Sequence, residues 1–166
     1  MTMTPKQFAT IAHKGQLRKY TGEPYIVHPA RVAQIVQSVT SDPDVIAAAW
    51  LHDVVEDTTV TLEEIRKEFG DNVARIVSEV TNVATEGTRK KRKSIERRHL
   101  NQASPDAKTI KLADIIDNCG NIVAYDSKFA AGYLREKLAA LYCLTKGNQH
   151  LWVLARCLLE NNTYYL

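Results

Sequence analysis

Apolar residues recur at intervals of three and four positions along nearly the whole chain, and this spacing limits the fold more than any other sequence feature. Side chains three and four positions apart share one face of an α-helix, whereas a half-buried strand needs strict alternation of apolar and polar residues. No alternating run of useful length occurs, and no internal repeat or linker interrupts the pattern. The sequence therefore predicts an all-α fold.

Explicit start signals accompany these helical patterns. A capping residue followed by proline at the first helical position occurs at Thr4-Pro5, Asp42-Pro43 and Ser104-Pro105. A capping box is expected from Thr61 to Glu64, and Gly70 suits the position just past that helix. Residues 25–27 are expected to be extended and to lead to His28 at the mouth of the next helix.

The first helix is expected to start at Pro5 and to carry Arg18 and Lys19 toward its end. Gly22 and Pro24 then break it, because glycine and proline favour turns.

Length and composition place the chain among ordinary globular proteins, with 45% hydrophobic and 25% charged residues in 166 positions. We expect one domain over residues 1–166. No apolar run approaches the ~20 residues of a membrane span, and the start lacks the pattern of a signal peptide. Cys119, Cys143 and Cys157 are unclustered, which favours reduced thiols over disulfides or a thiolate metal site. These features predict a cytoplasmic protein with no membrane partner.

Positive charge is concentrated in one stretch, since seven bases and one acid lie between Thr88 and His99. Such a run could bind a polyphosphate, a nucleic acid or an acidic protein, or it could be a solvated helix face. No aromatic residues interleave with it, so nucleic-acid binding is not expected.

Ionisable residues follow an apolar run at His52-Asp53 and continue with Glu56 and Asp57. Burying such groups is costly unless they bind a cation or one another. Imidazole and carboxylate together suit a divalent metal such as Mn, Fe or Zn. A solvated helix end with an incidental His-Asp pair is the alternative.

His28 and Asp114 are further candidates for this site. Asp114 interrupts an apolar helical face, and the alternative is a helix-surface acid facing Lys111 or Lys108. His28 could equally be a capping histidine.

Taken together, these segments resemble the HD-domain phosphohydrolases, and within them the stand-alone alarmone hydrolases of the RelA/SpoT type. The matching strings are AHKGQLRK at 12–19, GEPYIVHP at 22–29, LHDVVEDT at 51–58, FGDNVA at 69–74, VT at 80–81 and KLAD at 111–114 with Asn118. The likeness covers residues 8 to 144, and it implies a single HD-domain helical bundle without a synthetase domain.

The resemblance also implies the chemistry of the site. Its proposed metal ligands, holding one Mn²⁺ ion, are His28, His52, Asp53 and Asp114. Glu56 and Asp57 would orient and deprotonate a water, which a bound metal makes more acidic. The implied reaction removes pyrophosphate from the 3′ position of (p)ppGpp or (p)ppApp.

Substrate contacts are implied in the same way. Arg18 would stack on the base and, with Lys19, contact phosphates, because a planar guanidinium suits stacking. Arg98 would contact phosphate, Asn118 the ribose, and Tyr25 would line the nucleotide pocket.

Three positions depart from the usual family pattern: Ile115 replaces a base, Asp117 an aromatic residue and Asn121 a threonine-like residue. The metal and acid positions are intact, so hydrolysis is expected while the choice between guanine and adenine stays open. The alternatives are a phosphatase acting on another nucleotide such as NADPH, and an antitoxin-like neutralising partner of an alarmone synthetase. The oligomeric state is open, with a homo-oligomer among the options.

Overall fold

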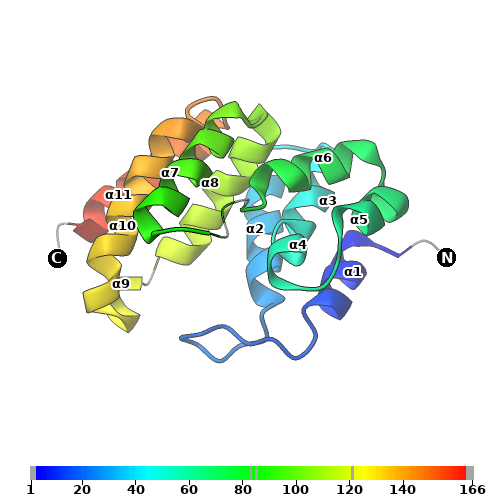
Figure 1. The fold of residues 1–166 in the computed structure, drawn as a ribbon, viewed down its shortest axis with the longest axis horizontal. Helices are drawn as coiled ribbons and strands as arrows, with labels where there is room; N and C mark the ends of the chain where they lie inside the picture. The colour runs from blue at the N-terminus through cyan, green and yellow to red at the C-terminus, as the bar shows by residue number, and fades with distance from the viewer. Residues whose placement is uncertain (1–2, 83, 85, 121, 164–166) are drawn as a thin grey trace. The chain divides into compact units, whose positions relative to one another are not determined.

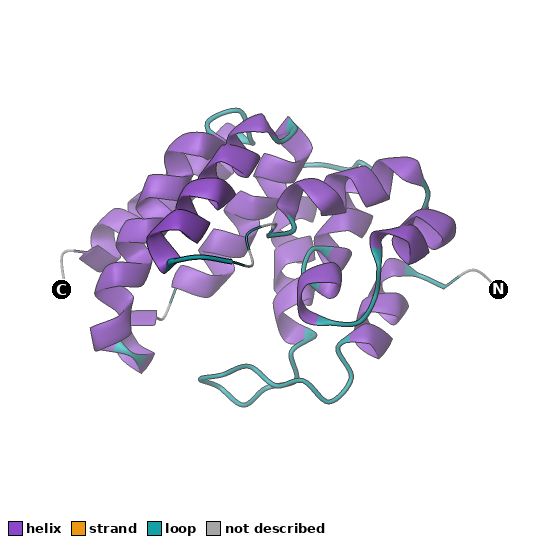
Figure 2. Cartoon of the chain, in the orientation of Figure 1, coloured by secondary structure: helices purple, strands orange, loops and turns teal. Residues whose placement is uncertain are grey.

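A computed structural model describes residues 3–82, 84, 86–120 and 122–163. Within them the regular elements are helices, and the one pairing of extended backbone is an isolated antiparallel bridge between Leu17 and Pro24 (Figure 2). The all-α prediction is confirmed. In the same part of the chain, no helix is long and apolar enough to cross a membrane. Asn121, one of the departures from the family pattern, lies outside the described residues.

The chain divides into two compact units, residues 1–81 and 82–166. The single HD domain over 1–166 stays a prediction. The helices of the first unit are α1 (Pro5–Ala12), α2 (Val27–Gln37), α3 (Pro43–Leu51), α4 (Val54–Asp57), α5 (Leu62–Phe69) and α6 (Asp71–Val80) (Figure 1).

Helix α3 is central to the first unit, because α1, α2 and α6 all pack against it and α5 packs against α6. Its sequence PDVIAAAWL is almost wholly apolar, and Ala48, Ala49 and Leu51 are completely buried. A helix that is apolar on every side belongs inside a core. The residue that follows it, His52, is therefore delivered into the interior of the unit.

The start signals of the first unit are confirmed. Thr4 and Thr61 each close a capping box, with Gln7 and Glu64 respectively. The Asp42 side chain accepts a hydrogen bond from the backbone N–H two residues on, and such caps satisfy donors that the helix itself leaves open.

The first helix is shorter than predicted, since it ends at Ala12 and not near Lys19. Gly15 has a φ of +83°, which ends the helical path. Arg18 therefore lies in a loop, where its backbone N–H donates to the Glu23 carbonyl at 2.8 Å.

The extended piece predicted at residues 25–27 is also wrong. Ile26 has φ −54° and ψ −20°, and the His28 N–H donates to the Tyr25 carbonyl at 2.9 Å, so this piece forms a turn into α2. These backbone bonds outweigh the preference of the branched residues in this piece for an extended chain.

The second unit contains α7 (Arg89–Gln102), α8 (Pro105–Cys119), α9 (Ile122–Tyr125), α10 (Ser127–Leu141), the 3₁₀ helix η1 (Tyr142–Leu144) and α11 (Gln149–Thr163). Helix α11 packs against α8 and α10, while η1 packs against α7. Ile110 and Leu112 of α8, Leu134 of α10 and Leu159 of α11 are fully buried in this unit. The whole basic stretch lies on α7.

Candidate active site

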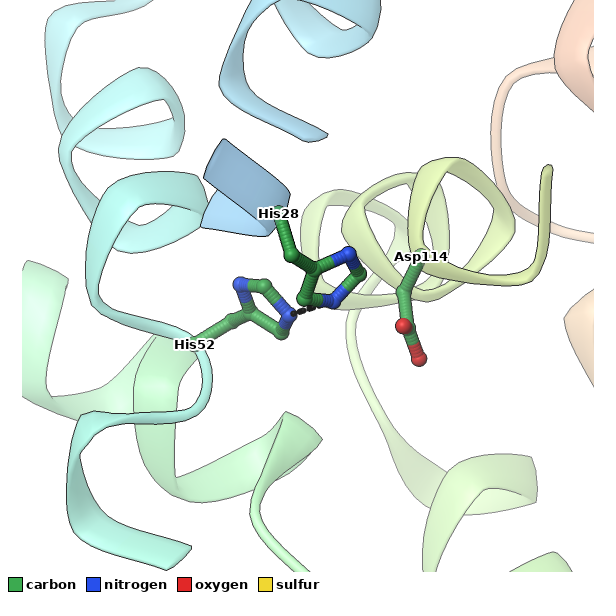
Figure 3. Close-up of side chains that lie close together, drawn as sticks. All are labelled: His28, His52 and Asp114. Carbon is green, nitrogen blue, oxygen red and sulfur yellow. Dashed lines mark hydrogen bonds between the residues drawn. The ribbon is translucent and has the colours of Figure 1, made fainter. Parts of the chain in front are cut away.

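Two histidines and an aspartate meet in the first unit. His28 is the second residue of α2, and His52 directly follows the last residue of α3. Because α2 packs against α3, the two imidazoles face each other, as Figure 3 shows. Both rings are buried. Asp53 follows at once and is the N-terminal cap residue of the short helix α4.

The ligand-type atoms of these residues converge on one point. The Nε2 atoms of His28 and His52 are 3.2 Å apart. The Asp53 Oδ2 atom lies 3.4 Å from Nε2 of His28 and 3.1 Å from Nε2 of His52. Protein ligands bind a divalent metal such as zinc at about 2.0–2.2 Å. Ligand atoms at that distance from one ion, about 90° to 110° apart, are about 2.8 to 3.6 Å from one another. This group could therefore hold a divalent metal.

Backbone contacts fix the His52 tautomer. Its Nδ1 lies 2.8 Å from the Ala49 carbonyl oxygen, which can only accept, so Nδ1 carries the proton and donates it. In the neutral ring Nε2 then offers its lone pair to the cluster, whereas in the protonated ring it donates to Asp53. A second hydrogen bond of this kind is what orients metal-binding histidines in proteins.

Asp53 is kept ionised by its surroundings. Burial alone would raise the pKa of this carboxyl, but charge interaction with His52 and hydrogen bonds from His28 and His52 hold it well below the usual value. The Tyr25 hydroxyl donates to Asp53 Oδ2 at 2.7 Å. Burial, with the charges of Asp53 and Asp57, raises the pKa of the Tyr25 phenol, so it remains a protonated donor.

Helix α4 presents Glu56 and Asp57 at the edge of this cluster, and both residues are exposed as a whole. The Asp57 carboxyl group itself is partly buried. This burial and the charge of Asp53 raise its pKa, and interaction with the Tyr25 hydroxyl opposes that rise. A carboxylate with a raised pKa is a better proton acceptor near neutral pH.

The loop before α2 brings Arg18 beside the cluster. The Arg18 guanidinium carbon lies 5.9 Å from the centroid of the Tyr25 ring. Lys19 is exposed and extends over the Tyr20 ring instead, at 4.8 Å. Arg18 and Tyr25 are therefore neighbours, which is necessary if both are to contact the same nucleotide.

Asp114 belongs to the second unit, on α8, and Figure 3 draws its side chain. It is 4% exposed, so it is no surface acid. Lys111 nevertheless lies 2.8 Å from its Oδ2, as the alternative interpretation expected, and Asn118 donates to its Oδ1. The carboxylate is thus held by a cation and an amide from its own helix.

Basic residues of the second unit are distributed unevenly. Arg98 is exposed on α7, whereas Lys93, Arg97 and Lys137 line a small pocket between α7 and α10. Burial, followed by the charge of Lys111, lowers the pKa of Lys137. Lys137 was not among the sequence candidates. Its position among the regularly spaced apolar residues of α10 was the signal that could have indicated it.

His13 and Gln16 were also missed as site residues. His13 is 2% exposed and stacks on Tyr25, with ring centroids 4.8 Å apart. Gln16 donates through Nε2 to the Asp57 backbone carbonyl at 2.8 Å. The available signal was their place in the string AHKGQLRK at 12–19, which resembles the hydrolases. The prediction had instead placed both residues within a longer first helix.

The chain is similar to several known hydrolases. A guanosine-3′,5′-bis(diphosphate) 3′-pyrophosphohydrolase of Aquifex aeolicus is 40% identical over 114 residues, 68% of this chain and 16% of that protein. The MESH1 enzymes of the same name from Xenopus tropicalis and Homo sapiens are 44% and 43% identical over 67% of this chain. The chain spans 63% of each MESH1 protein.

Solved structures agree on the fold. The structure of a metazoan ortholog of SpoT that hydrolyses ppGpp matches 95% of this chain and 93% of its own, with a TM-score of 0.87 and 30% identity. A protein from Listeria monocytogenes matches 88% of this chain and 99% of its own, with a TM-score of 0.70 and 27% identity. Residues 6–122 match the HD domain, and the chain belongs to the HD-domain family.

Proposed function

We propose that this protein hydrolyses the 3′-pyrophosphate of alarmone nucleotides, (p)ppGpp or (p)ppApp, and releases pyrophosphate. The observation that carries the proposal is the convergence of two imidazole nitrogens and a carboxylate oxygen within 3.1–3.4 Å. The relatives named as 3′-pyrophosphohydrolases of guanosine 3′,5′-bis(diphosphate) support the substrate class.

The cofactor of the proposed reaction is one Mn²⁺ ion held by His28, His52, Asp53 and Asp114. A mixed set of nitrogen and carboxylate ligands suits Mn²⁺. Asp114 is included because KLAD at 111–114 resembles the family motif; its carboxylate is buried and already pairs with Lys111. When bound, the metal would lower the pKa of a water toward neutrality and offset charge on the phosphates.

Glu56 and Asp57 are assigned to the water and its proton. Hydrolysis forms a bond from the water oxygen to the first phosphorus of the 3′-pyrophosphate and breaks the bond from that phosphorus to the ribose 3′ oxygen. The water gives up one proton, and the 3′ oxygen takes one. The raised pKa of Asp57 supports it as the acceptor of the first proton.

The remaining contacts are assigned to the nucleotide. Arg18 and Tyr25 would hold the base by stacking on it, since a guanidinium and an aromatic ring both stack on planar groups. Lys19 and Arg98 would pair with phosphates, and Asn118 would bond the ribose. The exposure of Lys19 and Arg98 is compatible with a ligand that reaches them from solvent.

A hydrolysis panel tests the proposal. The purified protein is stripped of metal with a chelator, and then resupplied with Mn²⁺, Mg²⁺ or Zn²⁺. Pyrophosphate release is measured with ppGpp, pppGpp, ppApp and pppApp, and phosphate release with NADPH. We expect Mn²⁺-dependent pyrophosphate release from at least one alarmone. Metal binding without turnover of any alarmone would refute the proposal. Release of phosphate from NADPH alone would favour the alternative, a phosphatase that acts on another nucleotide.

Two variants link the activity to the cluster. His52→Ala and Asp53→Ala each remove a proposed ligand and should abolish turnover, while circular dichroism shows that the helices persist. Asp71→Asn is the matched control, because the Asp71 side chain is 91% exposed and belongs to the start of α6. It should retain full activity.

Location and partners are a further part of the proposal. Free cysteines at 119, 143 and 157 support a reducing, cytoplasmic location. A homo-oligomer is tested by light scattering after size exclusion. Pairing with an alarmone synthetase is tested by co-expression, where rescue of growth by the wild type and not by His52→Ala would show that hydrolysis is the means of neutralisation.

A further inference from the structure

His13 and Gln16 lie outside the proposed ligand set and acid pair, yet their side chains connect the two. We propose that they are positioning residues: His13 supports Tyr25 against Asp53, and Gln16 holds the end of α4, which carries Asp57. The inference rests on the proposed function, which gives the ligands and the acids their roles.

A directed chain of hydrogen bonds runs from His13 to α4. The His13 Nδ1 atom is 2.7 Å from Gln16 Oε1, and Gln16 Nε2 is 2.8 Å from the carbonyl oxygen of Asp57. The Asp57 carbonyl can only accept, so the Gln16 amide nitrogen must face it. The Gln16 oxygen therefore faces His13 and accepts a hydrogen bond from the Nδ1–H group.

The buried environment of His13 fixes this arrangement. Its Nε2 is buried and has no hydrogen-bond partner among the described residues. With the proton on Nδ1, Nε2 is a bare acceptor. The other tautomer would bury an unpaired N–H and set two lone pairs against each other across 2.7 Å, which costs free energy twice. His13 is thus a committed donor to Gln16.

The ring of His13 contacts Tyr25, which in turn contacts the proposed ligand Asp53. It stacks on Tyr25 at a centroid distance of 4.8 Å and an interplanar angle of 36°. The Tyr25 hydroxyl in turn donates to Asp53 Oδ2 at 2.7 Å. One face of Tyr25 is therefore supported by His13, and the direction of its hydroxyl depends on that support.

Because the two links use different parts of the same residue, they can be cut separately. The ring reaches the ligand Asp53 through Tyr25, whereas Nδ1 reaches the α4 backbone through Gln16. Loss of the first link should loosen metal binding, since partners that orient a ligand typically contribute about 10- to 100-fold in affinity. Loss of the second should lower turnover, because a small misplacement of a reacting group can cost up to about 100-fold.

Gln16→Glu cuts the second link with little change in shape. One carboxylate oxygen can still accept from His13, but the other has no proton for the Asp57 carbonyl. At saturating Mn²⁺ we expect kcat to fall about tenfold or more, with KM and the Kd for Mn²⁺ within about twofold of the wild type. His13→Phe keeps the ring on Tyr25 and removes the donor, so it should behave like Gln16→Glu.

His13→Asn tests the first link. The asparagine amide can still donate to Gln16, but the ring that supports Tyr25 is gone. We expect the Kd for Mn²⁺, measured by calorimetry, to rise about tenfold, with most of kcat recovered when Mn²⁺ is saturating. Lys14→Ala is the control, because Lys14 is exposed on the same turn and should leave both quantities unchanged.

A purely structural role makes a different prediction. Each variant would then lose metal affinity and kcat in parallel, in proportion to the folded fraction seen in thermal unfolding. That result, or a Gln16→Glu variant with the kcat of the wild type, would overturn the inference. If the wild type hydrolyses no alarmone, the proposed function fails. The Mn²⁺ titrations of His13→Asn and Lys14→Ala still test the support of Tyr25 in that case, and equal affinities would overturn it.

Discussion

Tyr25→Phe removes one oxygen atom, the donor that contacts the proposed metal ligand Asp53. The Tyr25 hydroxyl lies 2.7 Å from Asp53 Oδ2. Burial and two neighbouring carboxylates raise the pKa of the phenol, so it is a protonated donor to an anion. Hydrogen bonds of this charged type are roughly twice as strong as neutral ones.

The size of the effect follows from that bond. A hydrogen bond to a charged group contributes about 1.5–3 kcal/mol, and 1.4 kcal/mol is about tenfold in an equilibrium constant. If the bond serves to orient Asp53 toward the metal, its loss should raise the Kd for Mn²⁺ about 10- to 100-fold. The helices should persist, because the phenylalanine ring fills the same space.

The same substitution should move the pH dependence of turnover. Burial and the charge of Asp53 raise the pKa of Asp57, and its interaction with the Tyr25 hydroxyl opposes that rise. Without the hydroxyl the pKa of Asp57 rises further. A base must be deprotonated to act, so activity should be lost at a higher pH as the pH falls.

The assay combines calorimetric titration with Mn²⁺ and a pH profile of kcat at saturating Mn²⁺. Tyr20→Phe is the control, since it removes a hydroxyl from the same loop, one that accepts from Lys19. An unchanged Kd for Mn²⁺ in Tyr25→Phe would refute the argument that this hydroxyl orients Asp53. A shift of the acid limb to lower pH would refute the assignment of Asp57 as the base.

Two further predictions concern the second unit. Gly147→Ala should lower the free energy of unfolding by about 1–3 kcal/mol, because its Cβ would lie 2.9 Å from Leu112 Cδ1. Gly132→Ala meets open space in α10 and should raise the free energy of unfolding by about 0.5–1 kcal/mol. Urea unfolding measures both changes. A thiol reagent at pH 8 should modify exposed Cys157 rapidly and Cys119 only on unfolding, because burial raises the pKa of the Cys119 thiol to about 12.

Much of the fold could be predicted because its signals are local. A capping threonine and its partner three residues on are neighbours in sequence, and Thr61 with Glu64 forms the expected box. The end of the first helix could not be predicted in this way. It depends on hydrogen bonds between Gln16 and Tyr25 and between Arg18 and Glu23, which form only when the loop closes.

The same division applies to the candidate site. His52 and Asp53 are adjacent in sequence, so their proximity needed no knowledge of the fold. The contact from Tyr25 to Asp53 spans 28 residues, and the contact from Gln16 to Asp57 spans 41. A polar residue whose partner is that distant carries no periodic signal. Sequence patterns therefore indicated the candidate acids and ligands, named Tyr25 only as part of a nucleotide pocket, and missed His13 and Gln16.

Burial also changes where the choice of nucleotide base should be sought. Ile115, one of the departures from the family pattern, is completely buried in the core of the second unit and offers a nucleotide no surface. Asp117 is half-buried and lies three residues after Asp114, so the two share a helix face.

When it is ionised, a carboxylate only accepts hydrogen bonds. Guanine presents adjacent N–H donors at N1 and N2, whereas adenine presents an acceptor at N1. If Asp117 reads the base, the wild type should prefer guanosine alarmones. Asp117→Ala should then lower kcat/KM for ppGpp more than for ppApp, with Asp71→Asn as the control. Equal losses for the two nucleotides would leave base recognition to the stacking of Arg18, which does not distinguish purines by their hydrogen-bonding edges.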